Sequence, residues 1–137
     1  MSAHTIKGLW AAGLLCLLTT AALAQDAPYG DAGAGEKVFA KCKSCHQVGE
    51  NAKSLSGPEL NGVISRKAAS VAGYNYSDAM KASGLTWDEP TFRDYMKNPK
   101  AKVPGTKMAF AGLSKDKDVD DLVAYLAQFA ADGKKAP

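Results

Sequence analysis

The feature that most restricts the possible folds is a short segment, KCKSCHQVG, that gathers sulfur and imidazole groups. Cys42 and Cys45 are separated by two residues, and His46 follows Cys45 directly. Such a segment can be a redox-active dithiol, half of a zinc site or the anchor of a larger prosthetic group. The chain has only one further cysteine, Cys16, and one further histidine, His4. Whether those two belong to the folded domain therefore decides how the segment is interpreted.

Both residues fall in an N-terminal segment with the pattern of a secretory signal peptide. Lys7 precedes an apolar run, and Ala22 and Ala24 then occupy the −3 and −1 positions of a small-residue cleavage site. The apolar run is short for a membrane span, which needs about 20 residues. We therefore expect residues 1–24 to be a cleaved secretory signal peptide, which also predicts export to the bacterial periplasm.

Cleavage leaves residues 25–137, which we expect to form a single domain with a frayed tail at residues 131–137. Lys7 is the only charged residue lost, so the formal net charge falls from +3 to +2. A balance this close to neutral argues against a general nucleic-acid binder. A chain of this size buries a modest core, to which a covalently held cofactor would add.

The small set of cysteines and histidines favours one interpretation of the segment. A structural zinc site needs four protein ligands, and a catalytic one needs three. Beyond the leader only Cys42, Cys45 and His46 remain. Two cysteines and one adjacent histidine cannot readily supply either set, and no second cluster exists. A redox dithiol would follow a strand, whereas the preceding AGAGEKVFAKC has a helical pattern. C-x-x-C-H is the attachment signature of c-type haem, in which both thiols form thioethers and the histidine binds the iron. A thiol oxidoreductase without haem stays open as the alternative.

The second axial position of such a haem requires another ligand or remains open. No second histidine is available, and methionine is the other common ligand. Met96 lies at helical spacing in TFRDYMKN, which favours a core side chain, and Met80 lies in a short polar helical stretch. Met108 lies in NPKAKVPGTKMAFAG, where Pro99 and Pro104 argue against regular structure. An irregular loop can wrap a prosthetic group, so we predict Met108 as the second ligand.

Helical patterns predict an all-α fold, because no strand-like alternation is present. We expect helices at about residues 33–45, from Ser77, from Thr86 to Asn98, and from Ser114. Ser77 and Ser114 are expected as N-caps, and Thr86 with Glu89 as a capping box.

Six segments identify a family resemblance: CKSCH, SGPEL, GYNYSDA, GLTWDEPTFRDYMKNPK, PGTKMAFAG and DLVAYLAQF. In this order they cover most of residues 33–130 and resemble the class I cytochromes c, in particular the small, soluble, mitochondrial-like bacterial c-type cytochromes. The resemblance implies that the N- and C-terminal helices cross at right angles and that loops wrap one covalently attached haem. Gly35 would lie at the crossing, with Phe39 and Tyr125 packed beside it.

The resemblance also implies roles for individual residues around the haem. Cys42 and Cys45 would form the thioethers, His46 and Met108 would be the axial ligands, and the Pro58 carbonyl would accept the His46 Nδ1 hydrogen. The other implied pocket residues are Leu60, Arg66, Tyr76, Trp87, Tyr95, Thr106 and Phe110.

Among these residues, Tyr76 and Trp87 would hydrogen-bond a buried propionate whose charge Arg66 offsets. Tyr95 and Thr106 would bond near the methionine sulfur and a propionate, while Leu60 and Phe110 supply apolar contacts. Met80 departs from the family, which commonly has asparagine at this position.

This ligation implies a soluble one-electron carrier that cycles ferric and ferrous haem c between membrane redox complexes, and not an enzyme. Lysines around the haem edge would steer acidic partners; these are Lys41, Lys43, Lys100, Lys102 and Lys107. The expected partners are a bc-type complex and a terminal oxidase. A reaction centre or a periplasmic dehydrogenase is the alternative partner. We expect a monomer that binds no nucleic acid and does not insert stably into membranes. The alternative is a haem enzyme or gas-binding cytochrome with an open sixth site.

Overall fold

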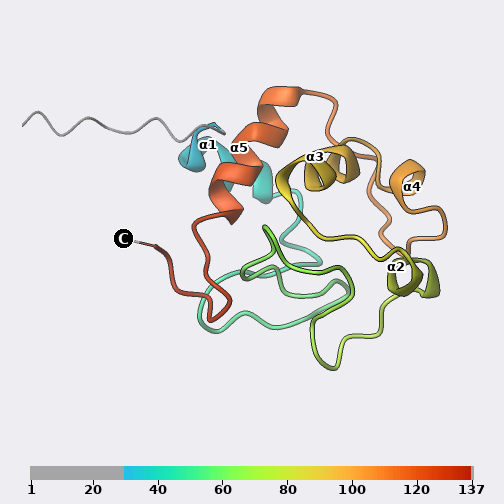
Figure 1. The fold of residues 1–137 in the computed structure, drawn as a ribbon. Coiled ribbons are helices and arrows are strands. Elements are labelled where there is room, and N and C mark those ends of the chain that lie inside the picture. Colours follow the sequence, from blue (N-terminus) through green and yellow to red (C-terminus); the bar gives the residue numbers. More distant parts are fainter. Residues whose placement is uncertain (1–29, 137) are drawn as a thin grey trace, which may run out of the picture.

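The structure is a computed structural model that describes residues 30–136, so the expected cleavage site at Ala24 lies outside the described residues. Within them the helices are α1 (Ala32–Phe39), α2 (Asp78–Ala82), α3 (Glu89–Lys97), α4 (Pro99–Lys102) and α5 (Asp116–Leu126). The same residues contain two isolated β-bridges and no extended strand. The all-α prediction is therefore confirmed, with long irregular segments connecting the helices (Figure 1). None of the described helices has the length and apolar character needed to cross a membrane.

Helices α1 and α5 pack against each other although they are the first and last helices of the described sequence (Figure 1). Gly35 permits this contact, because a Cβ atom at that position would lie 1.9 Å from the Asp121 carbonyl oxygen and 2.7 Å from Tyr125 Cβ. The rings of Phe39 and Tyr125 lie beside the contact, with centroids 5.4 Å apart. The expected roles of Gly35, Phe39 and Tyr125 in the helix pairing are confirmed.

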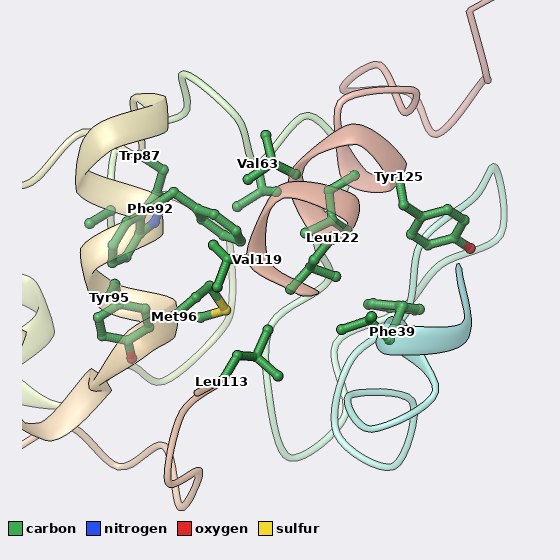
Figure 2. Close-up of a cluster of buried hydrophobic side chains, with 14 of the residues drawn as sticks. Phe39, Val63, Trp87, Phe92, Tyr95, Met96, Leu113, Val119, Leu122 and Tyr125 are labelled. Carbon is green, nitrogen blue, oxygen red and sulfur yellow. The ribbon is translucent and has the colours of Figure 1, made fainter. Parts of the chain in front are cut away.

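The main core lies between α3 and α5, as Figure 2 shows. Phe92, Tyr95 and Met96 line the buried side of α3, and Val119 and Leu122 face them from α5. Met96 is only 5% exposed, which confirms its prediction as a core side chain. The helical period of the sequence produces this arrangement, since residues three or four apart share one face.

Three of the predicted helix boundaries are wrong. Helix α1 ends at Phe39, and residues 40–45 continue as turns instead of helix. Helix α3 is capped by Asp88, whose side chain accepts a hydrogen bond of 2.9 Å from Thr91 N, so the capping box from Thr86 does not form. Helix α5 starts after Lys115 without a side-chain cap, so Ser114 is not its N-cap. Ser77, in contrast, caps α2 as predicted.

The fate of Thr86 gives the physical reason for the second error. Thr86 pairs with Lys67 in an isolated antiparallel bridge. Around it, Ser65 N donates to Trp87 O at 2.8 Å, and Trp87 N donates to Arg66 O at 2.8 Å. This long-range pairing holds the segment extended, and the helix begins only after it.

Pro99 does not prevent regular structure, contrary to prediction. It occupies the first turn of α4, where its missing N–H is not needed. The Asn98 side chain caps this short helix by accepting from Ala101 N at 3.1 Å. The irregular loop therefore starts only after Lys102, and it carries Met108.

The predicted frayed tail is also wrong for residues 131–136. Ala130 N donates to Lys134 O at 2.9 Å, and Ala136 N donates to Gln128 O at 2.8 Å, which folds the segment back on the end of α5. Gly133 is buried so closely against Gly49 that a Cβ atom would lie 2.2 Å from its carbonyl oxygen. The tail thus packs against the loop that follows the C-x-x-C-H motif.

Candidate haem-binding site

Every residue predicted to hold the haem or its iron lines one cavity of about 360 Å³. The volume falls in the usual range for ligand sites. The predicted residues that line it are Cys42, Cys45, His46, Pro58, Leu60, Arg66, Tyr76, Trp87, Tyr95, Thr106, Met108 and Phe110. The fold brings them together from the turn after α1, the loop of residues 46–76, the extended segment before α3 that carries Trp87, helix α3 and the loop before α5.

The turn after α1 directs both cysteines and the histidine into this cavity. Cys45 N and His46 N both donate to Cys42 O, at 3.0 and 2.9 Å. A helical turn of this kind brings residues three and four apart onto one side. Both sulfurs therefore reach the same edge of the cavity from a C-x-x-C spacing.

The His46 ring is held from two directions. Its Nδ1 atom lies 2.7 Å from the Pro58 carbonyl oxygen, so the tautomer with hydrogen on Nδ1 donates this hydrogen bond. The Nε2 lone pair is then left to bind a metal ion. Gly57 packs against the ring, and a Cβ atom there would lie 2.3 Å from His46 Cε1. Burial lowers the pKa of His46 more than the bond to Pro58 raises it, which favours the neutral imidazole that iron requires.

Met108 lines the same cavity and belongs to the irregular loop that follows α4. The Tyr95 hydroxyl donates to Met108 Sδ at 3.3 Å and lies 3.2 Å from Thr106 Oγ1. Thr106 Oγ1 also accepts from Met108 N at 3.3 Å. Burial raises the pKa of Tyr95 more than the contact with Thr106 lowers it, so its hydroxyl stays protonated and able to donate. Helix α3 thus positions the sulfur through Tyr95.

Arg66 and Trp87 reach the cavity from the paired segments described above. The Arg66 guanidinium binds Glu59 Oε1, Glu59 O and Asn61 O through its two Nη atoms. Its Nε atom is buried and has no partner among the described residues. A buried donor without an acceptor is costly, and a haem propionate is an acceptor of the required charge. The residues present therefore fit a haem with its carboxylates on this side.

Several cavity residues were not among the predicted site residues. Met80 was set aside as an iron ligand and noted as a departure from the family; it is 8% exposed and lines the cavity. Gly57 and Lys67 also line it. Gly57 could have been found from its position before Pro58 in the SGPEL segment. Lys67 is placed by its bridge to Thr86, which nothing in the local sequence indicates.

The five predicted docking lysines differ in their surroundings. Lys41 and Lys107 line the cavity, which places them at its rim. Lys41 Nζ lies 3.8 Å from an Asp118 carboxylate oxygen, and Lys102 Nζ lies 3.0 Å from Asp94 Oδ2. Within residues 30–136, no ion pair involves the other three, Lys43, Lys100 and Lys107.

The pairing of Lys41 shows where the acidic start of α5 lies. Asp118, in the first turn of α5, contacts Lys41. Asp118 is therefore close to the cavity rim and not on a remote face.

An all-α fold whose loops close on a cavity lined by C-x-x-C-H and a facing methionine defines a protein with covalently attached haem. Comparisons with known proteins agree. The cytochrome c family model matches residues 32–130. The chain is 64% identical over 106 residues to cytochrome c-554 of Methylosinus trichosporium, covering 77% of this chain and 80% of the relative. It is 57% identical over 105 residues to a cytochrome c2 of Rhodoplanes tepidamans, covering 77% and 98%.

Solved structures give the same result. Cytochrome cH from Methylobacterium extorquens superimposes with a TM-score of 0.67 at 53% identity, over 71% of this chain and 97% of that one. The chain belongs to the cytochrome c family. It is a small bacterial class I c-type cytochrome, an electron carrier with one covalently attached haem c.

Proposed function

We propose that the haem c of this electron carrier is bound through Cys42 and Cys45, with His46 and Met108 as its axial ligands. The observation that carries this proposal is the Met108 sulfur, which lies in the same cavity as His46 and accepts a hydrogen bond from Tyr95. When bound, the haem supplies a reversible one-electron change between ferric and ferrous iron. The protein residues hold both ligands in place, so little has to rearrange on electron transfer.

This ligation makes the protein a carrier and not an enzyme, because no coordination position remains for a substrate. His46 is fixed by Pro58 and Gly57 on one side, and Met108 is fixed by Tyr95 and Thr106 on the other. Electron transfer then takes place through the haem edge without bond formation to iron. The competing function, a haem enzyme or gas-binding cytochrome, requires that Met108 leave the iron free.

A pair of methionine substitutions separates the two functions. Met108→Ala should abolish the long-wavelength absorption band of sulfur–iron ligation, lower the reduction potential and introduce peroxidase activity. Met96→Ala is the matched control: Met96 also lines the cavity but is packed in the core, so it should lower stability and keep the band. A wild-type protein that binds carbon monoxide in its ferrous state at neutral pH would contradict the proposal.

We further propose that the rim of the cavity is the docking surface, formed by Lys41, Lys43, Lys100, Lys102 and Lys107. Exposed lysines steer partners with acidic faces and raise the association rate. A bc-type complex as donor and a terminal oxidase as acceptor fit this chemistry, as do a photosynthetic reaction centre or a periplasmic dehydrogenase. Such partners agree with export to the periplasm, which rests on the signal-peptide pattern of residues 1–24.

Charge reversal at the rim tests this surface. Lys100→Glu and Lys107→Glu should slow stopped-flow electron transfer to a purified oxidase severalfold at low salt, and the effect should shrink as salt rises. Lys134→Glu is the control, because Lys134 is exposed on the C-terminal segment, away from α4 (Figure 1). Asp118 is unsuitable as a remote control because it contacts Lys41. Equal slowing by all three lysine variants, or rates indifferent to salt, would contradict the docking surface.

A further inference from the structure

Glu59 forms an ion pair with the one arginine that lines the cavity. Its Oε1 atom lies 3.1 Å from Arg66 Nη1, and the two side chains are 21% and 18% exposed. Its second oxygen, Oε2, accepts from Asn61 N at 2.6 Å. The carboxylate is thus fixed in a partly buried position, where charges interact more strongly than at an open surface.

The remaining contacts of Arg66 define which part of it stays available. Nη1 donates to Glu59 Oε1 and to Asn61 O at 2.6 Å, and Nη2 donates to Glu59 O at 2.9 Å. Nε is the buried donor without a partner in the part of the chain that the structure describes. The segment that begins at Glu59 therefore occupies the outer end of the guanidinium and leaves Nε for an acceptor in the cavity.

We propose that Glu59 is a positioning residue that sets the reduction potential by cancelling part of the positive charge of Arg66 beside the haem. Ferric haem carries one more positive charge than ferrous haem. A cation near the haem therefore favours the ferrous state, and an anion paired with that cation restores the ferric state. With Glu59 in place, the potential is lower than it would be with Arg66 alone. This inference rests on the proposed placement of the haem next to Arg66.

The test is the reduction potential of the haem-loaded protein after Glu59→Gln, which removes the charge and keeps the shape. At a fixed applied potential, the ferrous-to-ferric ratio should rise about threefold, which for one electron corresponds to a shift of ~28 mV. Glu59→Ala is a second neutral variant, in which no side-chain amide has to be accommodated at this position. Glu59→Asp retains the charge and should shift the ratio much less than either.

A matched control comes from a second Glu–Arg pair. Glu89 Oε1 lies 2.8 Å from Arg93 Nε, and these side chains are 23% and 25% exposed, but neither lines the cavity. Glu89→Gln should leave the ratio nearly unchanged. A fall in the ratio for Glu59→Gln would overturn the proposal, since it would mean that Glu59 only holds Arg66 near the haem. An unchanged ratio, or an equal rise in Glu89→Gln, would also overturn it.

Two further readings separate this inference from the proposed ligation. Haem content and the sulfur–iron absorption band report the ligation, and both should persist in every Glu59 variant. Their persistence with an unchanged potential would remove the role of Glu59 alone. Loss of haem from both neutral variants but not from Glu59→Asp would likewise overturn the proposal, because the carboxylate would then serve maturation and not the potential.

Discussion

Replacement of Gly35 by alanine should destabilise the protein by forcing α1 and α5 apart. The added Cβ atom would lie 1.9 Å from the Asp121 carbonyl oxygen and 2.6 Å from its carbonyl carbon, whereas ordinary van der Waals contact begins at 3.4 Å. Two of the colliding atoms belong to the backbone of α5, and the third is Tyr125 Cβ, which no side-chain rotation moves. Only a shift of one helix relative to the other can relieve the overlap.

The size of the effect follows from three contributions. Overpacking in a core costs roughly 1–3 kcal/mol. Separation of the helices also weakens the Phe39–Tyr125 ring contact at 5.4 Å, which is worth roughly 0.5–1.5 kcal/mol. Alanine regains about 1 kcal/mol over glycine through helix propensity. We therefore expect a net loss of about 0.5–3.5 kcal/mol in the free energy of unfolding.

This loss is measured by unfolding the haem-loaded protein in guanidinium chloride. The signal is the fluorescence of Trp87, which the haem quenches in the folded protein. Gly33→Ala is the matched control on the same helix, because a Cβ atom there meets only the Asp31 side chain, at 3.2 Å. It should change stability by less than about 1 kcal/mol. Equal stabilities of Gly35→Ala and Gly33→Ala would refute the reasoning from the helix contact.

Three further predictions concern stability and haem attachment. Asp121→Asn should lose about 1–3 kcal/mol at pH 7: burial raises the pKa of Asp121, but the hydrogen bond from Asp31 N and the Lys117 ammonium outweigh it and hold the pKa below its ordinary value. Because the folded-state pKa is lowered, the difference from wild type should be complete above the unfolded value near 3.8. It should shrink below that pH and vanish once pH has fallen through the folded-state pKa, as thermal melts would show. Ser65→Gly should raise the free energy of unfolding by about 1 kcal/mol, measured by denaturant unfolding, since Ser65 has φ of 72°; Ser70→Gly, outside that conformation, should not. Cys42→Ala and Cys45→Ala should each leave a single thioether by mass spectrometry, and the double variant should neither retain haem nor fold.

The C-x-x-C-H residues could be predicted because covalent haem demands specific chemistry from them, whereas most other pocket residues were implied only by the family resemblance. The C-x-x-C-H motif supplies two thiols and a histidine, and residues 25–137 contain no other cysteine or histidine. The helical period likewise identified the buried faces of α3 and α5. Both signals are contained in a few neighbouring residues, so the sequence alone carries them.

The helix ends were less predictable because they depend on partners far along the chain. Thr86 has the residue type of an N-cap, but its pairing with Lys67 keeps it extended, and Asp88 caps the helix instead. Ser114 lies one residue too early for α5, which starts without a side-chain cap. A capping residue indicates that a helix starts nearby, while tertiary pairing selects the residue.

The C-terminal segment shows the same limit more strongly. Its composition, ADGKKAP, is that of a solvated tail, yet it packs because its neighbours offer complementary surfaces. Gly133 contacts Gly49 without side chains in between, and Lys135 Nζ lies 5.3 Å from the centre of the Phe129 ring. A lysine over an aromatic face gains a modest attraction even when partly exposed.

Ion pairs are the part of the surface that the sequence describes least, and they change how the electrostatics must be read. A lysine's place beside the C-x-x-C-H motif or the methionine loop says where it lies, but not what neutralises it. Lys41 and Lys102 have acidic partners, whereas Lys107 lines the cavity rim without one among residues 30–136. The steering field at the rim therefore depends more on Lys107 than a count of lysines suggests. The same distinction applies inside the cavity, where Arg66 is paired with Glu59 and does not stand as a lone charge.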